Sequence, residues 1–263
     1  MNDSDQRPPI LRVSAWEKFP QLVHGFCGRR GGVSRGEFAE FNLSHVVGDD
    51  PDCVRENWRR LRASLEGRIR FVTMRQQHGA EVVRVEEQPT DAPLADALMS
   101  HASGLALGIL TADCVPLLLV APERRVVAAV HAGWRGTVLG IAQRAVQSLE
   151  QTFGVAPSTL HAALGPAIGA CCYEVERDIT DEIERRWGPM PEAIATHDAK
   201  RRLDLRRVNR VLLAAVGVPA SHISSVGPCT WCGSEEYFSY RAACSRDAAD
   251  RTGRQLSFVG WYG

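Results

Sequence analysis

The sequence predicts one α/β domain, and three observations support this fold class. Three apolar runs of strand length, at 105–110, 115–120 and 126–130, follow one another and are separated by short polar segments. Runs of this length bounded by turn residues are typical of buried strands. Apolar residues recur at helical spacing elsewhere, first in 52–65, as expected for helices that cover a sheet. No linker or internal repeat divides the chain.

The other elements follow in order along the chain. Residues 1–9 are predicted to form a disordered tail, so that the domain spans 10–263. The helix at 52–65 is predicted to end at Gly67. The remaining predicted strands are 23–26, 69–74, 82–85, 161–164 and 256–261, and the remaining helices are 139–149, with Thr137 as its N-cap, 178–187 and 204–216.

The composition excludes several classes of function. Lys and Arg number 31 and Asp and Glu number 31, so the net charge is zero and no basic surface for nucleic acid is expected. No apolar run approaches the ~20 residues of a membrane helix. The polar start lacks the apolar core of a signal peptide, so the chain is predicted to be cytoplasmic. In that compartment the 8 cysteines are expected to be thiols or metal ligands.

Polar residues at the ends of predicted strands form the candidate site. Cys114 and His131 lie at the ends of neighbouring strands, and His78 lies in a polar turn between two others. Two imidazoles and one thiolate suit zinc or copper, and three protein ligands leave a fourth position for water. Bound zinc would lower the pKa of that water towards ~7. Two alternatives stay open, namely a Cys114 nucleophile with His131 as its base, or a buried thiol near hydrogen-bonded histidines.

Four further cysteines lie in two short motifs. Cys229 and Cys232 form a CxxC pair without a second pair at similar spacing, so loop packing is favoured over a structural zinc site. Pro228 completes half of the zinc signature of nucleoside deaminases, but the H-x-E half is absent from the sequence. The adjacent Cys171 and Cys172 are predicted to belong to the core.

Other polar residues are candidates for binding an anion or carrying a proton. Asp113, next to Cys114, could orient a ligand histidine or act as a proton carrier. Equally, it could accept hydrogen bonds from backbone at a strand end, and the arginines could be solvated or paired at the surface. The candidate anion-binding residues are Arg35 and Asn42 in the glycine-rich segment 28–51, Arg135 between two glycines before a helix, and Arg241 after two tyrosines.

Many of these residues, but not Arg35 or Asn42, lie in sequence blocks that resemble the laccase-domain family. This is the family of bacterial "polyphenol oxidase" homologues described as purine nucleoside phosphorylases with adenosine deaminase activity. The resemblance runs from about Gly25 to Val259, and the TADCxP and HAGWRG blocks are highly specific together. The matching blocks are 77–79 (QHG), 111–116 (TADCVP), 131–136 (HAGWRG), 165–166 (GP) with 171–175 (CCYEV), and 229–230 (CT) with 238–241 (FSYR).

The resemblance implies both a fold and an activity. The fold would be a single α/β domain with mixed β-sheets sandwiched by helices, in α-β-β-α layers. The cofactor would be zinc, with copper as the alternative, held by His78, Cys114 and His131. The activity would be phosphorolysis of adenosine, inosine and methylthioadenosine to the free base and ribose 1-phosphate, together with adenosine deamination. The partners would then be a nucleoside and phosphate.

Residue roles follow from this implied activity. Asp113, Cys114 and His131 would be catalytic, with water at the metal attacking the purine C6 and Asp113 assisting proton transfer. Arg35 and Arg135 would hold phosphate against the ribose C1′. One departure is that Arg241 is followed by Ala242, where the family usually has a second arginine.

Three rival functions remain on the sequence alone. A copper-dependent polyphenol oxidoreductase is disfavoured because none of the 8 histidines forms a His-x-His pair. A cysteine-type amidase that edits peptidoglycan precursors would use Cys114 as its nucleophile. A non-catalytic nucleotide-binding module would be stabilised by its ligand without turnover.

Overall fold

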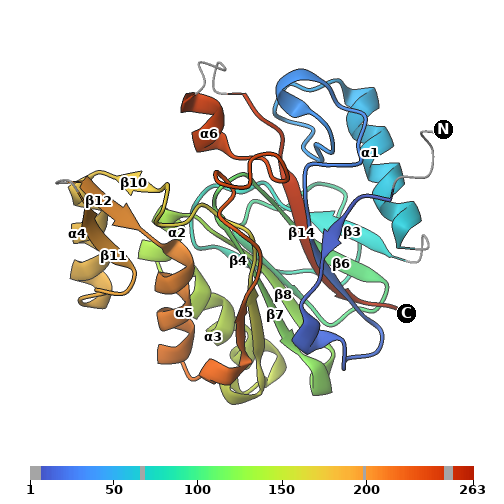
Figure 1. The fold of residues 1–263 in the computed structure, drawn as a ribbon. Helices are drawn as coiled ribbons and strands as arrows, with labels where there is room; N and C mark the ends of the chain where they lie inside the picture. Colours follow the sequence, from blue (N-terminus) through green and yellow to red (C-terminus); the bar gives the residue numbers. More distant parts are fainter. Residues whose placement is uncertain (1–6, 66–68, 198–199, 246–250) are drawn as a thin grey trace.

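A computed structural model describes residues 7–65, 69–197, 200–245 and 251–263 of the chain (Figure 1). Two large mixed β-sheets pack against each other, and helices cover their outer faces. The predicted fold class, a single α/β domain with mixed sheets sandwiched by helices, is therefore confirmed.

The first sheet has five strands in the order β1-β2-β14-β6-β3. The central strand β14 runs antiparallel to both neighbours, whereas β3 runs parallel to β6. Sequence patterns predicted four of these strands, because each carries a short buried apolar run. Their bounds are β1 Ile10–Leu11, β2 Leu22–Cys27, β3 Arg70–Thr73, β6 Leu105–Thr111 and β14 Gln255–Trp261.

The second sheet has six strands in the order β13-β9-β7-β8-β5-β4. Strands β7 and β8 form its centre and are buried along their whole length. β9 and β13 pair in parallel, so their carboxyl ends reach the same edge of the sheet. The bounds are β4 Val82–Arg84, β5 Ala97–Ser100, β7 Val115–Ala121, β8 Val126–Ala132, β9 His161–Leu164 and β13 Ile223–Ser225.

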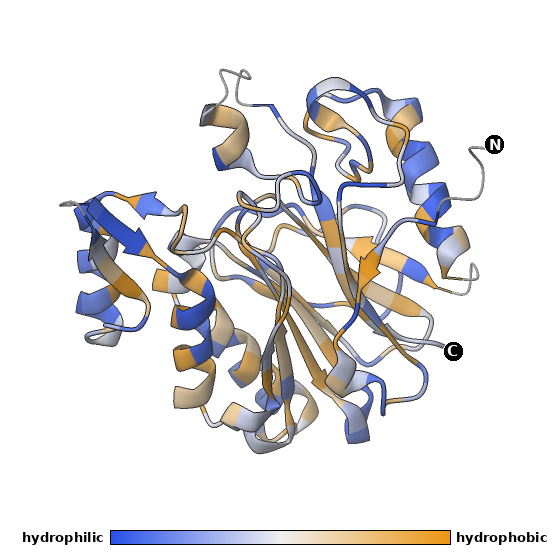
Figure 2. Ribbon diagram, viewed as in Figure 1, coloured by the Kyte–Doolittle hydropathy of each residue, from blue (hydrophilic) through white to orange (hydrophobic). Residues whose placement is uncertain are grey.

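Three apolar clusters connect the layers. The cluster between the sheets includes Leu107 of β6, Leu118 of β7 and Trp261 of β14. Helix α1 (Pro51–Ser64) covers the outer face of the first sheet through Val54 and Leu61. Helices α3 (Ile141–Phe153) and α5 (Leu205–Ala215) cover the second sheet. Figure 2 shows the apolar central strands between these helices, whose exposed sides are more polar.

A smaller sheet and helices α4 and α6 lie outside the two large sheets. Strands β10, β12 and β11 form a three-stranded sheet beside helix α4 (Arg177–Trp187). The sequence patterns did not predict β11 and β12, because β11 is largely exposed and β12 carries Lys and Arg in place of an apolar run. Helix α6 spans Tyr240–Ser245. The bounds of the strands are β10 Glu174–Val175, β11 Ile194–His197 and β12 Lys200–Leu203.

Two expectations about element ends need comment, and one is wrong. Thr137 lies inside the short helix α2 (Trp134–Val138), and Gly140 is the N-cap of α3. The chain breaks between the helices because Gly140 adopts φ +80°, a conformation that glycine tolerates. The predicted helix end at Gly67 lies outside the described residues.

The predicted tail overlaps the described residues only at 7–9. Pro8 is buried, and Pro9 accepts a hydrogen bond from the backbone N–H of Gly28 at 3.4 Å. The chain is therefore packed against the 28–32 segment from residue 8. Among the described helices, none has the length and apolar character needed to cross a membrane.

Candidate metal centre

His78, Cys114 and His131 come together at one end of the second sheet. Their ligand atoms all lie within 4.8 Å of one another. His131 is the penultimate residue of β8, and Cys114 directly precedes β7, the strand paired with β8. His78 lies in the connection from β3 to β4, with its Nε2 3.8 Å from the Cys114 Sγ. The expected convergence of three N and S donors is thus present.

The backbone around the three donors is specialised. His78 has φ +58° and Asp113 has φ +93°, a region that costs a residue with a side chain about 1 kcal/mol or more. Gly133 leaves space next to the donors. A Cβ at this position would lie 3.0 Å from the His78 Cδ2 and 3.2 Å from the Cys114 Sγ. The local backbone therefore holds the His78 and Cys114 side chains close together, and Gly133 places no side chain between them.

Asp96, which the sequence analysis did not select, orients the histidines. Its Oδ1 lies 2.8 Å from the Nδ1 of His131, and both side chains are almost fully buried. The same carboxylate accepts hydrogen bonds from the backbone N–H groups of Gln77, His78 and Gly79. This arrangement leaves the His131 Nε2 for a metal. Asp96, not Asp113, therefore orients the ligand histidine.

The electrostatics favour a charged thiolate. Burial opposes ionisation of Cys114, but the nearby His131 and His78 outweigh it and lower the pKa of the thiol to about 6. Burial likewise opposes protonation of His131, whereas Cys114 and Asp96 raise the pKa of its imidazole to about 9. A thiolate is the form of cysteine that binds metals.

This donor set fits a zinc ion. One thiolate and two imidazoles are ligands that zinc takes, and three protein ligands leave one position for a substrate or water. Cys114 is half-buried and His78 is exposed, so the open side of the cluster faces solvent.

If the three donors hold a metal ion such as zinc, replacing Gly133 with alanine is expected to weaken its binding about 10-fold or more, because the added methyl group displaces His78 and Cys114. The backbone itself tolerates alanine, since Gly133 has an extended conformation with φ −75°. Competition with a chromophoric chelator would measure the zinc Kd. A Gly133→Ala variant with the parental Kd would contradict this geometry.

Asp113 connects the centre to three distant segments. Its Oδ1 accepts a hydrogen bond from the Thr230 hydroxyl at 2.6 Å, and its Oδ2 accepts one from the Arg241 backbone N–H at 2.7 Å. Its carbonyl accepts the Ile168 N–H at 2.9 Å. Asp113 therefore fixes loops from three parts of the chain beside Cys114.

Three arginines interact electrostatically with Tyr173 or with residues of the centre. The charges of Arg241 and Arg135 both act on Tyr173, as does that of Cys114. Burial is the main cause that raises the pKa of Tyr173 to about 12. Arg254, which the sequence analysis missed, is close enough to interact electrostatically with Cys114 and Asp113, and burial lowers its pKa. Nothing in the sequence around Arg254 marked it as part of a site.

Comparison with known sequences identifies the family. The sequence model of the family described as "Multi-copper polyphenol oxidoreductase laccase" matches residues 23–262. The chain belongs to this laccase family.

Members of this laccase family carry a different name among curated proteins. A Geobacillus stearothermophilus protein named "Purine nucleoside phosphorylase YlmD" is 38% identical over 255 residues, which cover 92% of this chain and 91% of that protein. An Escherichia coli protein named "Purine nucleoside phosphorylase YfiH" is 35% identical over 249 residues, which cover 95% of this chain and 98% of that protein.

Solved structures of the laccase family share the fold. The crystal structure of YlmD from Geobacillus stearothermophilus has a TM-score of 0.85 at 37% identity, covering 93% of each chain. The crystal structure of the Bacillus licheniformis hypothetical protein YfiH has a TM-score of 0.87 at 30% identity, covering 98% of this chain and 97% of that one.

Two residues expected to bind a substrate make other contacts in this laccase-family fold. Asn42 is fully buried, and its amide contacts Ser44, Asp49 and the Arg254 backbone. It therefore holds its own loop and Arg254 in place and offers no exposed group to a ligand. Arg35 is exposed, and its charge acts on Cys53 of α1.

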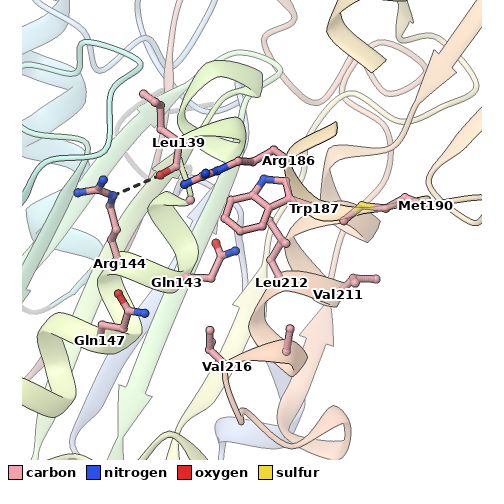
Figure 3. A pocket seen from close by; sticks show the side chains of 12 residues that line it. Leu139, Gln143, Arg144, Gln147, Arg186, Trp187, Met190, Val211, Leu212 and Val216 are labelled. Atoms are coloured by element: carbon pink, nitrogen blue, oxygen red, sulfur yellow. Dashed lines mark hydrogen bonds between the residues drawn. The ribbon is translucent and has the colours of Figure 1, made fainter. Parts of the chain in front are cut away.

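A groove in the helix layer is separate from the metal centre (Figure 3). The Arg144 Nε donates to the Leu139 carbonyl across part of it at 3.2 Å. Neither the three donors nor Asp113 lines this groove, so we do not assign it to the candidate active site. Its lining includes Leu139, Gln143, Arg144, Trp187, Val211 and Leu212.

Proposed function

We propose that the chain is a zinc-dependent purine nucleoside phosphorylase that also deaminates adenosine. The observation that carries the proposal is the His78, Cys114 and His131 cluster with arginines beside it. The names of its curated relatives support phosphorolysis. The proposed substrates are adenosine, inosine or methylthioadenosine, together with phosphate.

In this proposal His78, Cys114 and His131 hold the zinc ion. A bound zinc ion supplies Lewis-acid chemistry, which polarises an oxygen ligand and provides a nucleophile at neutral pH. Asp96 keeps the His131 ring in the orientation that leaves Nε2 free for the ion. With zinc bound, the negative charge of the Cys114 thiolate reduces the net positive charge of the metal centre. The affinity of the centre for anions is therefore lower than it would be with three neutral ligands.

In phosphorolysis, Arg135 and Arg241 bind and orient the phosphate, with Arg254 as a further cation beside them. A phosphate oxygen forms a bond to the ribose C1′ while the bond from C1′ to N9 breaks. The electron pair goes to the purine, which takes up a proton and leaves as the free base. The exposed Arg35 is a further phosphate-binding residue in this proposal.

In deamination, Asp113 acts as the proton carrier. Thr230 and the Arg241 backbone hold its two carboxylate oxygens, and a carboxylate retains further lone pairs to accept a proton. Water adds at the purine C6, the amine leaves as ammonia, and the proton from water passes through Asp113 to the leaving nitrogen.

The test is to incubate purified protein with adenosine and phosphate and to separate adenine, hypoxanthine, inosine and ribose 1-phosphate. Wild-type protein is expected to form adenine with an equal amount of ribose 1-phosphate. The Cys114→Ala variant is expected to lose at least about 100-fold in rate and most of the zinc at this site. Cys53→Ala, in α1, is the matched control. Unchanged product formation by Cys114→Ala would reject the mechanism.

A cysteine-type amidase is the second candidate, because one observation favours it. Cys114, His131 and Asp96 form a nucleophile, base and orienting carboxylate in series. Such a series does not need His78, whereas a three-ligand metal centre does. Hydrolysis of peptidoglycan precursor peptides by metal-free protein would support this candidate.

Two further proposals concern the alternative metal and the cellular location. Copper is the alternative metal, because the same three donors bind it and the family description names copper. A cytoplasmic location agrees with reduced cysteines, since none of the 8 cysteines forms a disulfide in the described structure.

A further inference from the structure

A second cluster of four cysteines lies outside the His78, Cys114 and His131 centre. Cys171 and Cys172 follow β9, and Cys229 and Cys232 follow β13. Because β9 and β13 are parallel neighbours, their following loops leave the same edge of the sheet. The four sulfurs all lie within 4.8 Å of one another. The expectation that Cys171 belongs to the core is therefore wrong, since its side chain is exposed, whereas Cys172 packs partly against the core.

The sulfur positions fit one tetrahedral ion. The Cys232 Sγ lies 3.5 Å from the Cys171 Sγ and 3.4 Å from the Cys172 Sγ. These distances exceed the ~2.05 Å of a disulfide bond. Zinc–sulfur bonds of about 2.3 Å place tetrahedral sulfurs about 3.8 Å apart. Small shifts of exposed side chains convert the observed cluster into that geometry.

The backbone already supports a thiolate in this cluster. The Gly169 N–H donates to the Cys229 Sγ at 3.3 Å. Donors of this kind stabilise negative charge on sulfur. Arg202 donates from Nη1 to the Cys171 carbonyl, which places a cation beside a site that would carry excess negative charge.

We propose that Cys171, Cys172, Cys229 and Cys232 bind one structural zinc ion, separate from the catalytic centre. Four thiolates occupy all positions of tetrahedral zinc, so this ion has no open position for a substrate. The sequence alone favoured loop packing over a zinc site for Cys229 and Cys232, because a second CxxC pair at similar spacing is absent. The fold supplies that second pair as two adjacent cysteines from another loop.

This ion would stabilise the loops that hold Thr230 and Asp113 beside Cys114. Thr230 lies inside the CxxC pair, and its hydroxyl donates to Asp113. Its backbone N–H donates to the Ala167 carbonyl, which joins the two cysteine-bearing loops. Closing both loops on one ion therefore fixes Thr230, and through it Asp113, next to Cys114.

The test measures zinc per chain in full-length protein expressed with zinc and purified under a non-thiol reductant. Wild type is expected to hold about two zinc ions per chain, one at each site. Cys114→Ala and the double variant Cys229→Ser/Cys232→Ser are each expected to hold about one. Cys53→Ser, the control, keeps the wild-type content. A double variant with wild-type zinc content would overturn the proposal.

The Cys114→Ala variant keeps all four cysteines, so it tests the proposal even if the double variant does not fold. Loaded with cobalt, it is expected to show the strong sulfur-to-cobalt charge-transfer absorption of a tetrathiolate site. An organomercurial thiol reagent is expected to release its zinc as these thiols react. Cys114→Ala protein without zinc, with iron in its place, or with a disulfide found by mass spectrometry would overturn the assignment.

Discussion

Replacing Asp96 with asparagine is expected to lower the rate of nucleoside phosphorolysis and the zinc affinity by about 10- to 100-fold. The carboxylate lies 2.8 Å from the His131 Nδ1 and fixes the ring tautomer that presents Nε2 to a metal. An amide can turn its NH₂ group towards Nδ1 and favour the other tautomer, which places a proton on the ligand nitrogen. Steady-state kinetics and zinc Kd measurements would check both effects.

Replacing Asp96 with alanine is expected to cost more, in stability as well as in activity. The backbone N–H groups of Gln77, His78 and Gly79 would lose their shared acceptor. The free energy of unfolding should fall by about 3 kcal/mol or more. Asp91→Asn, an exposed change on the segment before β5, is the control. An Asp96→Asn variant with wild-type kinetics and zinc affinity would refute the orienting role.

Removing zinc is expected to abolish phosphorolysis and also to expose a reactive thiol at Cys114. In the metal-free protein the Cys114 pKa of about 6 makes this thiol mostly thiolate at pH 7. Its reaction with iodoacetamide should therefore rise as pH increases through about 6 and level off above it. Zinc should protect the sulfur, and zinc added before alkylation should restore turnover.

The measurement is peptide mass spectrometry of alkylated protein over a pH series, with and without zinc. Cys53 is the internal control, because burial and nearby aspartates raise its pKa and keep its reaction slow. Equal labelling of Cys114 with and without zinc, or full activity after zinc removal, would favour the cysteine-type amidase.

Sequence patterns predicted most of the fold, because its strands are short apolar runs and its helices are amphipathic. The missed strands show the limit of this approach. Strand β12 carries Lys200, Arg201 and Arg202 in succession, so no apolar period marks it. The break at Gly140 was missed because the residues on either side of this left-handed glycine are both helical, so the sequence pattern across them looks like one continuous helix.

The candidate site was predictable only in part. Positions at predicted strand ends and in a polar turn selected His78, Cys114 and His131, and the family resemblance supported this choice. The approach of Cys114 to His131 depends on the pairing of β7 with β8. Asp96 was missed because its role arises from its place beside β8, far from His131 in the sequence. The four-cysteine cluster was missed for the same reason, since its two halves meet only through the pairing of β9 with β13.

Two of the three donors of the metal centre lie on chain segments that connect the two stacked sheets. His78 lies on the connection from β3 to β4, and Cys114 lies on the connection from β6 to β7, so both connections pass from one sheet to the other. His131 belongs to the second sheet alone. An ion held by all three would therefore join two segments that cross between the sheets to a strand of the second sheet.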